Sequence, residues 1–236
     1  GLYVYGQISS RLDKIEQPKL DEEKIMVNQE APKMTGYKTY VLFGIDSRGA
    51  SSQYSAQNSD TMIIVSVNND TKEVKLASVY RDTYLNIAGE GEEEKFRKAN
   101  AAYAAGGAEQ AVTMLNRNLD LDIDNYVAFD FKSVAEAIDI LGGVEIDIES
   151  QAEMDYLNDY ISYTSEYVGG SDETVDHLGK QTLNGVQAVS YARIRYTAGD
   201  DYKRAERQRR VLTEMIKKAD DLLYSIKTTT KGTYRI

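Results

Sequence analysis

The hydrophobic pattern of the first third of the chain predicts three consecutive strands. Residues 38–45 (KTYVLFGI) and 61–67 (TMIIVSV) are apolar on both faces, and residues 74–80 (VKLASVY) form a third extended run. Strands without a polar side belong to sheets that are covered on both faces. A turn signal at residues 68–71 (NNDT) lies between the second and third runs. We therefore expect these strands to form an up-down-up meander.

Further along the chain, helical periodicity alternates with short extended runs. Helices are predicted where apolar residues recur at helical spacing or a glycine pair ends the pattern, in residues 98–105, 108–118, 133–141 and 202–224. Short strands are predicted in residues 126–131, 144–148 and 188–192, the second of them as an edge strand. This alternation of helices and strands favours a layered α/β domain.

Two regions lack a clear period. Residues 84–97 contain an acidic run and predict an irregular loop, while residues 150–178 are acidic, rich in Tyr and Ser, and predict an insertion. A helix N-cap is expected near Asp176 or Thr182. We interpret the whole as an N-terminal helix and linker (1–36), one three-layer α-β-α domain (37–226) and a disordered or truncated tail (227–236).

The predicted meander places charged residues at one end of the sheet. Asp46 follows the first strand, Asp60 begins the second, and Arg81 follows the third. If the predicted strand 188–192 runs in the same direction as the first, Arg193 reaches this end as well. Carboxylates and arginines are then expected to converge on one rim.

A basic segment near the C-terminal end contrasts with the formal net charge of −10. Residues 193–210 contain seven basic side chains and three acidic ones. Such a patch on an acidic protein favours an anionic ligand, and arginine suits bidentate recognition of phosphate. A solvated helix end with surface salt bridges is the alternative interpretation.

The composition excludes several kinds of chemistry. The chain has no Cys and one His, His177, so it lacks disulfides, cysteine nucleophiles and multi-histidine metal sites. A metal would depend on oxygen ligands, which favour magnesium, manganese or calcium. No run of 18 or more apolar residues occurs, so we expect no membrane-spanning helix within this chain.

An ordered series of motifs resembles the LytR-CpsA-Psr family of bacterial cell-envelope proteins. The series extends over about 170 residues and comprises Phe43-Gly44-Ile45-Asp46-Ser47-Arg48, Ser59-Asp60-Thr61-Met62, Arg81-Asp82-Thr83, Lys98-Ala99-Asn100-Ala101-Ala102-Tyr103, Leu141-Gly142-Gly143-Val144, Leu183-Asn184-Gly185, and Tyr191-Ala192-Arg193-Ile194-Arg195 with Asp201, Arg204 and Arg207-Gln208. The resemblance implies a mixed central sheet flanked by helices and an apolar pocket for a polyprenyl chain. It also implies an N-terminal membrane helix, absent from this chain, that anchors the domain outside the cytoplasmic membrane.

The activity implied by the resemblance is phosphotransfer. An anionic glycan, of the wall teichoic acid or capsular polysaccharide type, would pass from a polyprenyl pyrophosphate carrier to a peptidoglycan hydroxyl. The resemblance assigns metal binding to Asp46 and Asp60, with Mg²⁺ expected and Mn²⁺ as a second possibility. It assigns pyrophosphate binding to Arg81, Arg193, Arg195, Arg204 and Gln208.

Catalysis is expected to rest on Arg81 and Asp60. Arg81 would stabilise the transferring phosphate, while Asp60 and Asp82 are both candidates for accepting the hydroxyl proton. Asp201 would orient an arginine. A non-catalytic regulator that binds polyprenyl phosphate through the same arginines is the alternative function. The acidic net charge and the absence of an aromatic-basic surface argue against nucleic acid as a partner.

Overall fold

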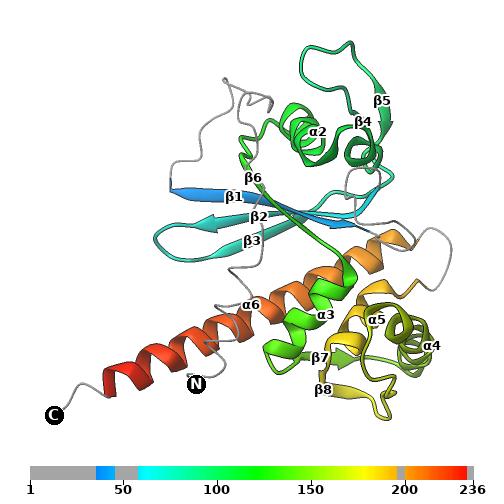
Figure 1. Cartoon of the computed structure of the whole chain (residues 1–236), viewed down its shortest axis with the longest axis vertical. Coiled ribbons are helices and arrows are strands. Elements are labelled where there is room, and N and C mark those ends of the chain that lie inside the picture. Colours follow the sequence, from blue (N-terminus) through cyan, green and yellow to red (C-terminus); the bar gives the residue numbers. More distant parts are fainter. Residues whose placement is uncertain (1–35, 46–57, 196–199, 233–236) are drawn as a thin grey trace. The chain divides into compact units, whose positions relative to one another are not determined.

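The computed structural model describes residues 36–45, 58–195 and 200–232, which form two compact units (Figure 1). The division falls after Phe131. We call the described residues up to Phe131 the sheet unit and those from Lys132 onward the helical unit. The predicted N-terminal helix and linker lie outside the described residues, and the predicted borders of the domain stay a prediction.

A mixed sheet of four strands forms the centre of the sheet unit. Its strands follow the order β3 (Val74–Ser78), β2 (Ser59–Asn68), β1 (Tyr37–Ile45) and β6 (Asn125–Phe129). β1, β2 and β3 pair antiparallel, which confirms the predicted meander, and β6 joins β1 in parallel. Asn68 Oδ1 accepts hydrogen bonds from the backbone N–H groups of Asp70 and Thr71, so its side chain closes the β2–β3 turn.

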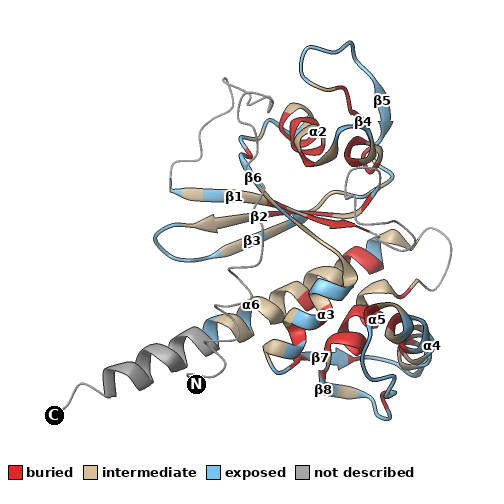
Figure 2. Ribbon diagram, in the orientation of Figure 1, coloured by how far each residue is buried: buried red, intermediate tan, exposed pale blue. Residues whose placement is uncertain are grey.

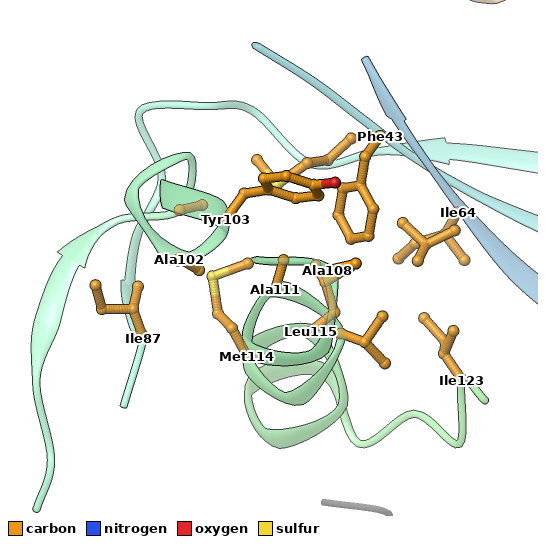
Figure 3. Packing of buried hydrophobic residues seen from close by; sticks show 14 of the residues in the cluster. Phe43, Ile64, Ile87, Ala102, Tyr103, Ala108, Ala111, Met114, Leu115 and Ile123 are labelled. Atoms are coloured by element: carbon orange, nitrogen blue, oxygen red, sulfur yellow. The ribbon is translucent and has the colours of Figure 1, made fainter. Parts of the chain in front are cut away.

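The core of this unit forms where α2 (Ala101–Leu119) packs against the sheet (Figure 3). Alternate residues of β1 and β2 point toward the helix because side chains on a strand alternate between its faces. Phe43 meets Tyr103 edge-on, with ring centroids 5.3 Å apart. The buried cluster also contains Val41, Met62, Ile64, Ala111, Val112 and Leu115.

The predicted pair of helices in residues 98–118 is present as α2 with a break at Gly106 and Gly107. Gly107 has φ 67° and ψ −157°, a backbone conformation that is essentially restricted to glycine. The helix ends at Asp120, which is in the left-handed conformation and bonds back to the carbonyl of Asn116.

Residues 84–98 form a small hairpin, which corrects the prediction of an irregular loop. β4 (Tyr84–Asn86) pairs antiparallel with β5 (Phe96–Lys98). Asn86 organises the connection, because its Oδ1 accepts from the backbone N–H groups of Ala88 and Lys95. Asn118 near the end of α2 bonds both backbone groups of Asn86 and so ties the hairpin to the helix.

The helical unit contains four helices and a two-stranded sheet among its described residues (Figure 2). Their order is α3 (Phe131–Ile140, which begins at the division), β7 (Val144–Ile148), α4 (Gln151–Val168), β8 (Gly179–Leu183), α5 (Gly185–Arg193) and α6 (Asp201–Gly232). Within the part of the chain that the structure describes, β7 pairs with β8 alone, so the predicted edge strand belongs to a separate sheet. α6 also includes residues 227–232 of the predicted tail.

Two predictions for this unit are wrong. Residues 151–168 of the predicted insertion form a regular helix, α4. The predicted strand 188–192 lies within α5, whose N-cap is Asn184, two residues from Thr182, near which the sequence predicts an N-cap. Asn184 and Gln187 form a reciprocal capping box, which fixes the start of this helix.

The predicted α/β class, with a mixed central sheet flanked by helices, is confirmed. None of the helices described is both long enough and apolar enough to cross a bilayer.

Candidate functional site

The sheet unit joins two of the predicted catalytic residues directly. Asp60 lies at the start of β2, and Arg81 lies in the turn that follows β3. Arg81 Nη1 donates a hydrogen bond to Asp60 Oδ1 at 2.6 Å. The two side chains are 26% and 30% exposed, so the pair is accessible to a ligand. The prediction that these strand ends meet is confirmed for Asp60 and Arg81, while Asp46 lies outside the described residues.

Backbone hydrogen bonds hold the Arg81 turn against the start of α2. The carbonyl of Arg81 accepts from the N–H of Asn100 at 3.1 Å, and that of Thr83 accepts from Ala99 at 2.8 Å. Lys98 Nζ contacts Asp82 Oδ1 at 2.7 Å. We call Asp60, Arg81, Asp82 and Lys98 the Arg81 cluster. Its two positive and two negative side chains balance each other.

Two buried polar atoms at this cluster have no hydrogen-bond partner among the described residues. They are Arg81 Nε and the hydroxyl oxygen of Ser59, the residue that precedes Asp60. Buried polar groups are usually paired, because an unpaired one loses its bonds to water without compensation. Arg81 Nε belongs to the Asp60–Arg81 pair, whereas the Ser59 side chain points to the opposite face of β2 from Asp60. The unpaired Arg81 Nε makes this pair the best-supported ligand site in the sheet unit. Sequence analysis noted Ser59 only as part of a motif.

The helical unit gathers two of the predicted phosphate-binding arginines around one carboxylate. Asp201 Oδ1 contacts Arg195 Nη2 at 3.1 Å and Arg204 Nη2 at 2.9 Å. Asp201 lies in the first turn of α6, where a negative charge is favourable to the helix dipole. The prediction that Asp201 orients an arginine is confirmed, and it orients two. We call these three residues the Asp201 cluster.

Arg193 and Gln208 occupy different places in the same unit. Arg193 ends α5, and its Nη1 donates to Thr164 Oγ1 of α4 at 3.0 Å. Its guanidinium also lies over the ring of Tyr160, 5.8 Å from the centroid. Gln208 lies on α6 one turn beyond Arg204. The predicted convergence of Arg193, Arg195, Arg204 and Gln208 with the Arg81 cluster concerns both units, and it stays a prediction.

Other basic residues of the C-terminal segment hold the helices together. Arg207 Nε bonds Glu153 Oε1 at 3.0 Å, and both side chains are buried. The other oxygen of Glu153 accepts from the backbone N–H of Glu149, while its own N–H donates to the Ser150 hydroxyl at the start of α4. The spacing Ser150-x-x-Glu153 is a capping-box signal that would have located this helix start from the sequence.

Tyr191 packs inside this network, and the pKa of its phenol is raised. Burial raises the pKa of its phenol to about 12 from the ordinary value of 10.0, and the charge of Glu153 adds to this shift. The folded state therefore keeps a proton between about pH 10 and pH 12 that the unfolded chain loses. Stability tied to this group is complete below pH 10 and declines as the pH rises through 12.

Tyr191→Phe should flatten the alkaline part of the stability curve. We expect the wild type to lose about 2 to 3 kcal/mol more than the variant between pH 9.5 and pH 12, the amount linked to a shift of two units. Urea unfolding of both proteins at intervals across this range measures the difference. Parallel curves would show that another group governs the alkaline transition.

The helical unit also contains two polar hollows of about 370 Å³ each. One is lined by Glu149, Glu153, Lys203, Glu206, Arg207 and Arg210, and the other by residues around Asp139, Glu173 and Asp176. Neither has the apolar lining that a polyprenyl chain requires. The predicted apolar pocket stays a prediction.

The metal prediction rests on Asp60 within the described residues. No group of three or more His, Asp or Glu side chains in this part of the chain could hold a metal ion. Mg²⁺, however, often uses only one or two protein carboxylates together with phosphate oxygens and water. The carboxylate of Asp60 is partly exposed and fits the role of such a ligand.

This combination of a mixed α/β sheet, a carboxylate–arginine pair at its rim and the ordered motifs defines a protein family. The chain belongs to the LytR-CpsA-Psr family, whose model (LytR_cpsA_psr family) matches residues 2–231.

Among its relatives, the polyisoprenyl-teichoic acid–peptidoglycan teichoic acid transferase TagU of Enterococcus faecalis is 32% identical over 223 residues, which cover 92% of this chain and 64% of TagU. Biofilm regulatory protein A of Streptococcus mutans is 33% identical over 184 residues, covering 75% of this chain and 43% of that protein. The chain thus spans less than two thirds of the length of either relative.

Solved structures of TagT share the fold. TagT bound to LI-WTA superposes with a TM-score of 0.66 at 28% identity, covering 79% of this chain and 66% of TagT. The family protein YwtF (TagT) with bound octaprenyl pyrophosphate lipid gives a TM-score of 0.62 at 26% identity, with the same coverage.

Proposed function

We propose that the protein transfers an anionic glycan from a polyprenyl pyrophosphate carrier to a hydroxyl group of peptidoglycan. The observation that carries this proposal is the accessible Arg81–Asp60 pair, in which Arg81 Nε has no hydrogen-bond partner among the described residues. The relative TagU is named as a teichoic acid transferase, and the similar YwtF structure holds octaprenyl pyrophosphate. A pyrophosphate offers the acceptor oxygens that an arginine requires.

In this reaction, the acceptor oxygen forms a bond to the phosphorus that carries the glycan. The bond from that phosphorus to the bridging oxygen breaks, and polyprenyl phosphate leaves with the electron pair. The hydroxyl proton passes to a carboxylate or to water. Arg81 stabilises the negative charge on the transferring phosphate, which is the main contribution a protein makes to phosphoryl transfer.

We assign two roles to Asp60 in this chemistry. It holds the guanidinium of Arg81 in place, and with Asp46 it would be a ligand of Mg²⁺, which neutralises pyrophosphate charge when bound. Mn²⁺ has the same preference for oxygen and is the second candidate. We keep Arg193, Arg195, Arg204 and Gln208 as proposed pyrophosphate ligands.

This function places the domain on the extracytoplasmic face of the cell membrane. The carrier lipid resides in the membrane, and peptidoglycan lies outside it. We accordingly propose that the full-length protein is anchored by a single N-terminal helix.

A transfer assay tests the proposal. The protein is incubated with a synthetic polyprenyl pyrophosphate glycan and a peptidoglycan oligomer, with Mg²⁺, with Mn²⁺ or with EDTA. We expect coupled release of polyprenyl phosphate and formation of glycan-linked peptidoglycan, with at least tenfold less product in EDTA. Lipid binding without any product under all three conditions would overturn the enzymatic proposal.

That last outcome would favour a second function, a regulator that binds polyprenyl phosphate without turnover. Biofilm regulatory protein A, a relative at 33% identity, gives this candidate its specific support.

A further inference from the structure

Two aromatic side chains on the β4–β5 hairpin are exposed to solvent and stack on each other. Tyr84 is 67% exposed and Phe96 is 42% exposed. Their ring centroids are 6.0 Å apart and the planes are inclined by 26°. Tyr84 pairs with Lys98 across the hairpin and Asn86 pairs with Phe96, so the two rings are diagonal neighbours on one face. We call this pair the aromatic platform.

The aromatic platform continues directly into the Arg81 cluster within the sheet unit. Lys98, the partner of Tyr84, contacts Asp82, and Asp82 lies 3.8 Å from Arg81 Nε. If the proposed transfer takes place beside Arg81, the attacking hydroxyl must come within bonding reach of the phosphorus there. The sugar that bears this hydroxyl must therefore lie against a surface next to the Arg81 cluster.

We propose that the aromatic platform binds a sugar ring of the peptidoglycan acceptor, an inference that rests on the proposed function. The face of an aromatic ring carries partial negative charge, while the C–H groups on one side of a pyranose ring carry partial positive charge. The two surfaces stack, and exposed aromatic rings thereby select a sugar.

The chemistry of the rings distinguishes the acceptor from the donor glycan. Charge alone does not select the ligand, because the exposed glutamates Glu90, Glu92, Glu93 and Glu94 lie close to Lys95, Arg97 and Lys98, and Arg117 bonds the carbonyls of Ala88 and Gly89. The two rings of the aromatic platform are uncharged and offer nothing to the charged groups of the anionic donor glycan. They can stack on the uncharged amino-sugar rings of peptidoglycan, so the proposal assigns them to the acceptor.

The main test compares Tyr84→Ala with Tyr84→Phe in the transfer assay. Tyr84→Ala should raise KM for the peptidoglycan oligomer about tenfold, with kcat and KM for the lipid pyrophosphate within twofold of wild type. Tyr84→Phe retains the ring and should remain within twofold in all three constants. Tyr163→Ala on α4 is the matched control, because Tyr163 is equally exposed, at 72%. An unchanged acceptor KM in Tyr84→Ala, or an equal rise in Tyr163→Ala, would refute the inference.

A binding measurement separates this inference from the proposed function. Cosedimentation of each protein with insoluble peptidoglycan sacculi requires no turnover, and Tyr84→Ala should bind about tenfold more weakly. Weaker binding together with no transfer by the wild type would support the platform and refute the enzyme. Unchanged binding together with normal transfer would refute the platform and support the enzyme.

Two further experiments test other roles of the rings. Tyr84→Leu and Phe96→Leu keep a cross-strand apolar contact but lack the aromatic face, so they should match Tyr84→Ala in acceptor KM even if alanine loosens the hairpin. Cosedimentation with phosphatidylglycerol–phosphatidylethanolamine vesicles tests whether the rings contact lipid. Loss of vesicle binding with intact sacculus binding would contradict the proposal.

Discussion

Arg81→Ala should reduce the rate of glycan transfer about a thousandfold, the range seen when a single charge-stabilising group is removed from a phosphoryl-transfer or oxyanion site. The Arg81–Asp60 pair is partly exposed, so the fold should survive the change. Arg81→Lys keeps the positive charge but loses the planar fork, and we expect it to recover only part of the rate. Single-turnover transfer at saturating carrier lipid measures the effect on chemistry.

The control for this prediction is Lys217→Ala, which removes an exposed positive charge on α6. It should transfer at the wild-type rate. A loss of less than tenfold in Arg81→Ala would assign the charge stabilisation to another residue. Asp60→Asn adds information, because it removes the carboxylate while leaving an oxygen to accept from Arg81.

Glu153→Ala should destabilise the protein by roughly 3 to 5 kcal/mol, because it leaves the buried guanidinium of Arg207 without its carboxylate. The same change removes the bonds that Glu153 makes with the backbone at the start of α4. For a chain of this size we expect the thermal midpoint to fall by roughly 10 °C. Circular dichroism during heating gives the midpoint.

Two variants show whether burial is the cause. Glu149→Ala removes an exposed partner of Arg210 and should cost about 1 kcal/mol or less. The double variant Glu153→Gln with Arg207→Met removes both charges and should recover much of the loss. Equal destabilisation by Glu149→Ala and Glu153→Ala would show that burial does not determine the cost.

The sheet could be predicted because its strands interact mainly with their neighbours in sequence. The apolar runs of β1 and β2 and the turn at Asn68 specify a meander without any distant contact. The hairpin of Tyr84 and Phe96 escaped prediction because its strands are three residues long. Its register depends on Asn86 and Asn118, which act through distant backbone groups.

The errors in the helical unit arise in helices whose polar and apolar faces are hard to tell apart. All residues of α5 from Gly185 to Tyr191 are buried, so the helix shows no polar side and its apolar run resembles a strand. α4 gives the opposite difficulty, because exposed tyrosines such as Tyr163 blur the contrast between its faces. In both cases the capping residues, Asn184 and Ser150, carried the more reliable signal.

For the candidate site, the sequence predicted the Asp60–Arg81 pair and the orienting role of Asp201. Both predictions concern residues at the ends of strands or helices, where short connections leave few alternative positions for a side chain. The buried Ser59 hydroxyl and the pairing of Arg207 with Glu153 could not be foreseen. They depend on which side chains the surrounding fold screens from water.

The break at Gly107 divides α2 into two parts that share one apolar core. Ala99 and Asn100, just before the start of the helix, hold the turn of Arg81 through backbone hydrogen bonds. Any residue with a side chain would disfavour the backbone conformation of Gly107 and favour an uninterrupted helix. A single achiral position therefore governs the packing that supports the Arg81 turn.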